Sequence, residues 1–510
     1  MQNNIQSIGI IGSGVMGTGI VQIAIQSGHD VYLYDQNTQA LQQAQQRLHD
    51  TFDKLIAKGK LNSAQVKQFL ARLHIANELA SLKSCDLVIE AIIENLEIKQ
   101  TLFQQLEDIV SPNTILASNT SSLSITAIAA PCRHPERVIG YHFFNPVPLM
   151  KVVEVICGLR TDTKIAEQLS DLANKMGHRP VQTKDTPGFI INHAGRAYTT
   201  EALKILNENV TTIAEIDQIL RASLGFRMGA FELLDLTGLD VSHPVMESIY
   251  HQYYEEARYR PNVLTQQMLT GKKLGRKTGE GFYQYIDQQK QLPSQQKLTI
   301  PDHIPARKVW LATDFAQDRQ QLTQYLQQKN IELDRNETPD TDSLALVACY
   351  GEDASSSAMR LNLNPKQVVA IDLISGFEQQ RTLMPTLVTN PDFKNFAYAL
   401  FQDEQVHLSL IEESVGFVAQ RVLAMVVNLG CDMAQQAIAT VEDINAAVRL
   451  GLGYPYGPIE WGDHVGADKI LLTLERMNQL TGDPRYRPSP WLQRRCRLNL
   501  ALTFVTHPNH

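Results

Sequence analysis

The first 35 residues follow a pattern that few folds accommodate. A short apolar run over 7–11 leads into the turn Gly12-Ser13-Gly14-Val15-Met16-Gly17, and the following residues predict a helix over 18–27. A second apolar run over 31–34 ends at Asp35. In such a unit the first glycine permits a tight turn, the second lets the backbone approach a pyrophosphate, and the third allows close helix–strand packing. The sequence therefore predicts a dinucleotide site whose loop contacts are Gly12, Gly14, Val15, Met16 and Gly17.

The acid after the second run indicates which dinucleotide binds. Asp35 lies 18 residues after the last glycine of the loop, where a carboxylate hydrogen-bonds the ribose hydroxyls and repels a 2′-phosphate. Gln36 and Asn37 offer no cation to replace it. We therefore expect NAD rather than NADP.

Two further apolar runs, 86–93 and 114–117, are followed by polar residues. In a doubly wound sheet, ligands bind beyond the carboxyl ends of the strands. The alternative is that the hydroxyl and amide groups here cap the helix that starts near Leu123, a task that Ser122 could perform while Ser121 faces the ligand. The polar side chains predicted at or just after strand ends are Glu94, Lys99, Asn119, Ser121 and His142.

His142 lies in the first of two apolar runs, 140–144 and 151–156, which are joined by the proline-rich break 145–148. This joint can bring His142 beside Glu154 in the second run. A carboxylate on one ring nitrogen fixes the tautomer, so that the other nitrogen can take a proton near neutral pH. The alternative is a buried histidine satisfied by a backbone carbonyl.

The segment 41–73 predicts two helices with a turn at 58–60. It contains lysines that could meet an acidic substrate tail, although a solvated helix face is the simpler interpretation. These are Lys54, Lys58, Lys60 and Lys67.

Composition excludes several classes of function. The chain has 510 residues, of which 43% are apolar and 20% charged, with a net charge of −8. This charge argues against a nucleic-acid partner, and no apolar run approaches the length of a membrane span. The six cysteines are scattered without a C-x-x-C pair, which predicts reduced thiols in a cytoplasmic protein and no metal site.

The second half of the chain repeats part of the first. With one offset of 228 residues, Gly188-Phe189 aligns with Gly416-Phe417, and the match continues over about 53 positions. A fixed offset of this length indicates a duplicated helical domain. Asn192 is matched by Gln420. The other matched pairs include Gly229/Gly457, Glu232/Glu460, Asp235/Asp463, Gly238/Gly466 and Asp240/Asp468.

Between the copies, apolar runs at 308–312, 343–347 and 368–371 predict strands in an alternating α/β region. No glycine fingerprint follows Ala312 and no His–Glu pair is evident, so we expect a degenerate nucleotide-binding domain that packs rather than binds. A glutamine-rich linker, 288–296, precedes it. The expected domains are therefore 1–187, 188–287, 300–410 and 411–510.

Long motifs in the first half resemble the L-3-hydroxyacyl-CoA dehydrogenases. They are GIIGSGVMGTGI (9–20), IEAIIENLEIK (89–99), ASNTSSLSIT (117–126), GYHFFNPVPLMKVVEV (140–155), KDTPGFIIN (184–192) and LGRKTGEGFYQY (274–285). The resemblance implies an α/β fold in which an N-terminal Rossmann-type NAD domain precedes an all-helical C-terminal domain. The pair is then repeated in degenerate form in the second half.

The resemblance also implies roles for individual residues. His142 would be the base with Glu154 as its partner, while Ser121 and Asn192 would contact the substrate oxygen and the histidine. The family usually has arginine after this asparagine, where this chain has His193. Positions that touch NAD in the family are occupied by Asp35, Gln36, Ala91, Glu94, Lys99, Asn119, Asn145 and Lys277.

Length and domain order resemble the fused branch of the family in bacterial phenylacetate degradation. This implies an acyl-CoA thioester substrate such as 3-hydroxyadipyl-CoA or 3-hydroxybutyryl-CoA. It also implies that the two helical copies pair within the chain, with a homodimer possible through other surfaces. Two alternatives remain open, namely a β-hydroxyacid dehydrogenase with a catalytic lysine and a non-catalytic NAD-binding structural protein.

Overall fold

The structure, a computed structural model, describes residues 5–292, 301 and 304–505. The chain forms two compact units. The first comprises 1–193 and 436–452, and the second comprises 194–435 and 453–510. A short stretch of the second helical copy thus belongs to the unit that carries the glycine loop. Part of the predicted linker 288–296 lies outside the described residues.

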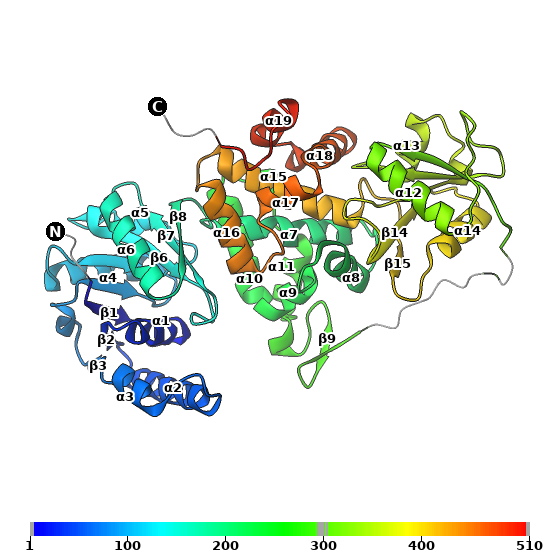
Figure 1. The fold of residues 1–510 in the computed structure, drawn as a ribbon. Helices are drawn as coiled ribbons and strands as arrows, with labels where there is room; N and C mark the ends of the chain where they lie inside the picture. The colour runs from blue at the N-terminus through cyan, green and yellow to red at the C-terminus, as the bar shows by residue number, and fades with distance from the viewer. Residues whose placement is uncertain (1–4, 293–300, 302–303, 506–510) are drawn as a thin grey trace. The chain divides into compact units, whose positions relative to one another are not determined.

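The first unit contains an eight-stranded sheet in the order β3-β2-β1-β4-β5-β6-β7-β8 (Figure 1). Neighbouring strands are parallel except for the antiparallel pair β6 and β7. The order places a topological switch point between β1 and β4, where dinucleotides bind in such sheets. The strands are β1 (Ser7–Ile11), β2 (Asp30–Tyr34), β3 (Leu73–Ala76), β4 (Leu87–Glu90), β5 (Ile115–Ser118), β6 (Val138–Phe143), β7 (Val152–Cys157) and β8 (Arg179–Lys184).

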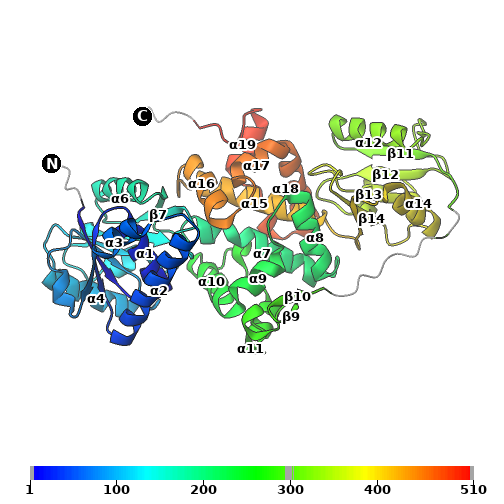
Figure 2. The same cartoon turned by 60° about the horizontal axis from the view of Figure 1, so that its bottom comes forward.

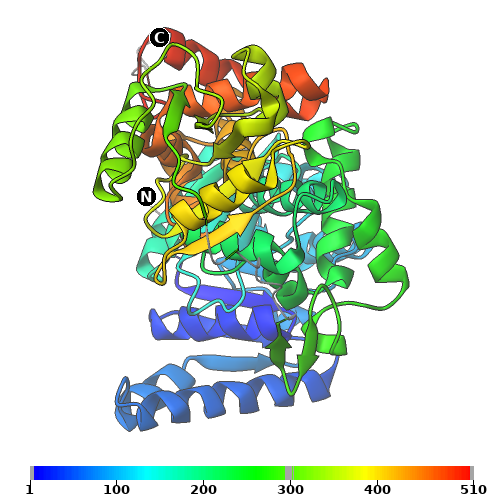
Figure 3. The ribbon, with the colours of Figure 1, turned by 90° about the vertical axis from the view of Figure 1, so that its right-hand side faces the viewer.

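Helices cover both faces of this sheet. One apolar core joins it to α1 (Val15–Gln26), α2 (Thr38–Ala57) and α6 (Thr163–Lys175), and α1 lies beside α2 (Figure 3). A second core joins the other face to α4 (Leu96–Ile109) and α5 (Ile125–Ala129).

The segment 41–73 forms two helices as predicted, most of α2 and then α3 (Ser63–Leu70). The turn between them contains Gly59, which has a φ of +66°. The side chains of the four lysines in this segment are exposed, as a solvated helix face requires.

The second unit contains most of both helical copies. The first copy has α7 (Ile191–Asn207), which begins in the first unit, and then α8 (Ile213–Leu224), α9 (Ala230–Thr237), α10 (Leu239–Gln252), α11 (Val263–Thr270) and the hairpin β9 (Gln284–Ile286) and β10 (Gln289–Gln291). The second copy has α15 (Val418–Gln435), α17 (Pro458–Val465), α18 (Ala467–Thr481) and α19 (Pro490–Arg497), while its α16 (Val441–Leu452) lies in the first unit.

The region between the copies forms a five-stranded sheet in the order β11-β12-β13-β14-β15 (Figure 2). Its three predicted strands are confirmed as β11 (Val309–Thr313), β12 (Leu344–Ala348) and β13 (Val368–Ile371), followed by β14 (Gln380–Pro385) and β15 (His407–Leu410). Helices α12 (Ala316–Gln328) and α14 (Pro391–Phe401) share one core with the sheet, and the rings of Tyr325 and Phe401 stack 5.2 Å apart. The short α13 (Ala354–Arg360) follows β12.

The two helical copies contact each other inside the second unit. The buried Arg421 on α15 bonds Glu201 on α7 at 2.8 Å, and Tyr486 donates to the same carboxylate at 2.9 Å. Aromatic rings add apolar contact, with Phe226 and Trp461 5.2 Å apart. Ion pairs and rings from both copies therefore fill one shared interface.

All six cysteines are free thiols, as their spacing predicted. Among the residues described, none of the helices combines the length and apolarity needed to cross a bilayer.

Candidate active site

The glycine loop after β1 has the shape that a pyrophosphate requires. Gly12 has a φ of +104°, and a Cβ there would lie 2.4 Å from the carbonyl oxygen of Ala91. A Cβ on Gly17 would lie 1.8 Å from the carbonyl oxygen of Gly12. A Cβ on Gly14 would instead meet no other atom within 4 Å. The loop is thus closed on its protein side and open where phosphates would approach the start of α1, so these residues fit a dinucleotide.

Asp35 follows β2 and is held beside this loop. Its Oδ2 accepts hydrogen bonds from the Ser13 amide at 2.8 Å and hydroxyl at 2.7 Å, and its Oδ1 accepts from the Asn37 amide at 2.9 Å. Burial acts to raise the pKa of Asp35, but these donors hold it below its ordinary value. A fixed negative charge therefore stands where the adenosine ribose would lie.

His142 and Glu154 are brought together by strand register. They are direct partners in the antiparallel pair β6 and β7, and His142 Nδ1 lies 2.7 Å from Glu154 Oε2. The histidine is 5% exposed and the glutamate is fully buried. The interpretation of His142 as a buried histidine bonded to a carbonyl is therefore wrong. Its Nε2 is the nitrogen left to exchange a proton with a ligand.

The other oxygen of Glu154 is anchored as well. Oε1 accepts hydrogen bonds from the amides of Ile190 and Ile191, each at 2.9 Å. These amides stand at the start of α7, where backbone N–H groups have no partner within the helix, so they are available to the carboxylate. Phe144 packs on His142, and the centroids of the two rings are 4.3 Å apart. Both members of the pair are thus fixed in place.

Ser121 and Asn192 lie close to each other in the same unit. The Asn192 side chain donates to the Ser121 carbonyl oxygen at 3.1 Å, and the Ser121 hydroxyl donates to Glu94 Oε1 at 3.1 Å. Burial acts to raise the pKa of Glu94, but Lys99 and the surrounding hydroxyl and amide donors hold it below its ordinary value.

A buried ion pair that sequence reasoning missed lies beneath this cluster. Glu90, at the end of β4, bonds Lys99 at 2.6 Å and accepts from the Ser118 hydroxyl at 2.7 Å. Glu90 is fully buried and Lys99 is 1% exposed. The signal available in the sequence was a charged residue ending an otherwise apolar strand.

The remaining predicted cofactor contacts are divided between the two units, with Asn119, Gln36 and Asn145 in the first and Lys277 in the second. Asn119 orients β6, because its side-chain oxygen accepts from the Phe143 amide at 2.8 Å, while Gln36 and Asn145 are exposed. Lys277 lies in the second unit, where it forms an ion pair with Asp240 at 2.5 Å.

The predicted cap of the helix near Leu123 is wrong. The helix α5 begins at Ile125, and its N-cap is Ser124, whose hydroxyl accepts from the Ala127 amide. Ser122 instead donates its hydroxyl to Glu94 at 3.0 Å. Ser122 and Ser124 lie on either side of Leu123, and the bond to Glu94 engages Ser122 while Ser124 caps the helix.

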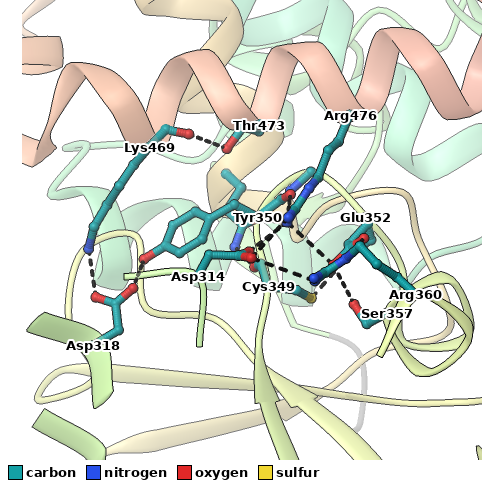
Figure 4. A network of polar contacts seen from close by, with 12 residues as sticks. Asp314, Asp318, Cys349, Tyr350, Glu352, Ser357, Arg360, Lys469, Thr473 and Arg476 are labelled. Atoms are coloured by element: carbon teal, nitrogen blue, oxygen red, sulfur yellow. Dashed lines mark hydrogen bonds and ion pairs between the residues drawn. The ribbon is translucent and has the colours of Figure 1, made fainter. Parts of the chain in front are cut away.

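The equivalent edge of the five-stranded sheet is filled by charged side chains (Figure 4). Lys469 on α18 bonds Asp318 at 2.7 Å. Arg476 on the same helix bonds Asp314 at 2.9 Å and Glu352 at 3.3 Å. Carboxylates and helix side chains therefore occupy the space that phosphates would need.

The position equivalent to His142 holds no histidine. Asp372 follows β13 and lies opposite Thr382 of the antiparallel β14, as His142 lies opposite Glu154. Gln420 donates to Asp372 at 3.0 Å. His407 on β15 does bond a glutamate at 2.9 Å, but this is Glu215 on α8, outside the region between the copies, and the contact lies away from β13.

Family models match most of the chain. The 3-hydroxyacyl-CoA dehydrogenase NAD binding domain matches residues 7–186, and the 3-hydroxyacyl-CoA dehydrogenase C-terminal domain matches twice, over 188–285 and 416–501. The glycine loop, the acid after β2 and the buried His–Glu pair define an NAD-binding oxidoreductase. The chain belongs to the 3-hydroxyacyl-CoA dehydrogenase family and is an NAD-dependent enzyme that oxidises 3-hydroxyacyl-CoA.

Individual relatives extend over different lengths. The 3-hydroxyadipyl-CoA dehydrogenase of Escherichia coli (strain K12) is 37% identical over 98% of this chain and 99% of its own. The crystal structure of 3-hydroxybutyryl-CoA dehydrogenase from Escherichia coli K12 has a TM-score of 0.84 at 35% identity, covering 97% of this chain and 99% of that one. The mitochondrial hydroxyacyl-coenzyme A dehydrogenase of Homo sapiens is 38% identical over 55% of this chain and 91% of its own.

Proposed function

We propose that this enzyme oxidises a short L-3-hydroxyacyl-CoA, either 3-hydroxyadipyl-CoA or 3-hydroxybutyryl-CoA, with His142 as the catalytic base. The observation that carries the proposal is the 2.7 Å bond between the histidine and the buried Glu154. The choice of substrate is supported by the relatives that match nearly the whole chain, whose names carry these two thioesters.

The chain's own residues account for the proton transfer. Glu154 holds the Nδ1 proton of His142, so Nε2 accepts the proton of the substrate hydroxyl as the carbonyl forms. The imidazolium that results is stabilised by the same carboxylate, whose charge the amides of Ile190 and Ile191 support. Bound NAD supplies the acceptor for the hydride that leaves the carbinol carbon. Ser121 and Asn192 hold and polarise the oxygen.

The remaining roles follow from position. Asp35, with the glycine loop, binds the adenosine end of NAD, and Glu94 and Lys99 line the path toward the nicotinamide. One chain carries one NAD site, because only the first sheet combines an open glycine loop with a His–Glu pair at β6. The two helical copies pair within the chain. The acyl-CoA thioester is the substrate that binds beside NAD, and any homodimer uses other surfaces. We expect a cytoplasmic location.

The first test is the variant His142→Gln, assayed by NADH formation from 3-hydroxyadipyl-CoA and 3-hydroxybutyryl-CoA. Glutamine keeps the size and hydrogen bonding of the side chain but cannot take the proton. We expect kcat to fall by about 10²–10⁴-fold, the usual contribution of a general base. The affinity for NADH should stay unchanged, which serves as the control for folding. Near-normal turnover would show that another group is the base.

A further inference from the structure

Helix α16 belongs to the second helical copy, yet it packs on the active half of the chain. Within the first unit it contacts β7 and β8. Arg179 on β8 bonds Glu442 at 2.8 Å and Asp443 at 3.2 Å. The Lys184 amide also donates to the carbonyl oxygen of Ile438, just before the helix, at 2.9 Å. Side-chain and backbone bonds thus fasten α16 beside the strand that carries Glu154.

The same arrangement occurs a second time inside the second unit, shifted by 228 residues. There the Glu412 amide donates to the Val210 carbonyl oxygen at 2.9 Å. His407 on β15 bonds Glu215 at the start of α8, and α8 contacts β14. Each helical copy therefore lends one helix to the sheet of the other half. Because the contact occurs twice at matching positions, it is a regular feature of the duplicated fold.

At its far end α16 reaches the anchor of the catalytic pair. A Cβ on Gly451 would lie 2.4 Å from Ile191 Cδ1 and 3.0 Å from Ile191 Cγ1. Ile191 is 1% exposed, and its amide is one of the two that hold Glu154 Oε1. The equivalent position in the first copy is Ser223, so the duplicated pattern does not itself demand glycine. The absence of a side chain at 451 lets α16 seat directly on Ile191.

We propose that α16 is a positioning element for catalysis and that Gly451 is its positioning residue, acting through Ile191 on Glu154. This inference rests on the proposed role of Glu154 as the partner of His142. The carboxylate is fixed by backbone amides at the start of α7, so a shift of Ile191 moves Glu154 and rotates the imidazole away from the substrate hydroxyl. The second half of the chain is then required for activity although it carries no catalytic group.

The test is Gly451→Ala in the full-length enzyme. The added methyl must displace Ile191, and we expect kcat to fall about ten-fold, since small misplacements of catalytic groups are costly. KM for NAD should stay unchanged, because the glycine loop follows β1, which four strands separate from β8. Gly451→Val extends the series and should lower kcat further. Ile191→Val removes the Cδ1 atom that clashes first, so the double variant Gly451→Ala with Ile191→Val should regain most of the lost rate.

Gly462 on α17 is a matched control. A Cβ there would lie 2.4 Å from Leu502 Cδ1, an equally close contact inside the second unit. Gly462→Ala should lower the melting temperature while kcat stays unchanged. The inference is overturned if Gly451→Ala keeps the wild-type kcat, if Ile191→Val restores nothing, or if Gly462→Ala lowers kcat equally. If one of these results is obtained and the His142→Gln variant is inactive, only the role of α16 is refuted. A fully active His142→Gln variant would instead refute the proposed base.

Discussion

Two carboxylates of the first unit, those of Glu154 and Asp35, differ in their burial and in their hydrogen-bond partners. Glu154 is fully buried. One of its carboxylate oxygens bonds His142, and the other accepts from backbone amides. Asp35 is bonded only to backbone amides and one serine hydroxyl, at the border of the open glycine loop. In the proposed mechanism the first serves proton transfer and the second serves cofactor choice, although both are acidic residues at or within a strand.

At the residue scale, cofactor preference should follow Asp35. We expect the double variant Asp35→Ser with Gln36→Arg to shift the ratio of kcat/KM for NADP over NAD upward by about ten- to hundred-fold. This is the range that a charge-assisted hydrogen bond to the 2′-phosphate supplies. Gln36→Arg alone keeps the repelling carboxylate and should shift the ratio much less. A native enzyme that already prefers NADP in steady-state assays would contradict the assignment of Asp35.

At the scale of elements, the edge beyond β11, β12 and β13 is a packed interface rather than an open ligand site. Lys469 and Arg476 project from one helix onto acids that follow two strands (Figure 4). Asp372 lies deeper, and burial raises its pKa to about 6, with Gln420 bonded to it. The polar groups at this edge are thus satisfied by the protein itself.

Asp372 gives this edge a pH-dependent stability. Because its pKa is raised in the folded state, the folded protein holds the proton more tightly, and its contribution is most favourable below about pH 4 and is lost as pH rises through about 6. The loss is on the order of 2–3 kcal/mol. Asp372→Asn keeps the acceptor for Gln420 without the charge, so the melting temperature of the variant relative to wild type should rise between pH 4.5 and 7.5. The exposed Asp342→Asn is the control, and a parallel rise there would contradict this account.

Much of the first unit was predictable because its signals are local. The glycine loop, the acid after β2 and the alternation around His142 and Glu154 each lie within a few residues, and the break at 145–148 fixed which strands pair. The capping serine was mispredicted, since Ser122 and Ser124 differ only in their distant partners Glu94 and Asp185. The position of α16 on the first sheet could not be predicted. Its contacts with β8 join residues about 260 positions apart, and no local sequence pattern marks such a pair.

For the whole molecule, duplication explains the length of the chain. The helical domain occurs twice, the copies meet through Arg421 and Glu201, and each half receives a helix from the other. A tethered copy has a high effective concentration, so it can supply within one chain a surface that a separate subunit would otherwise have to bring. The second sheet supports this arrangement while its ligand edge is filled.

The central claim, one cofactor site per chain, is tested most directly by calorimetric titration of the full-length enzyme with NADH. We expect a single class of sites with a stoichiometry near one per chain, and the same titration of a Gly14→Asp variant should show no binding, because a carboxylate would then stand where the pyrophosphate approaches. A stoichiometry near two, or binding that survives in the Gly14→Asp variant, would contradict the account by placing a working nucleotide site in the second sheet.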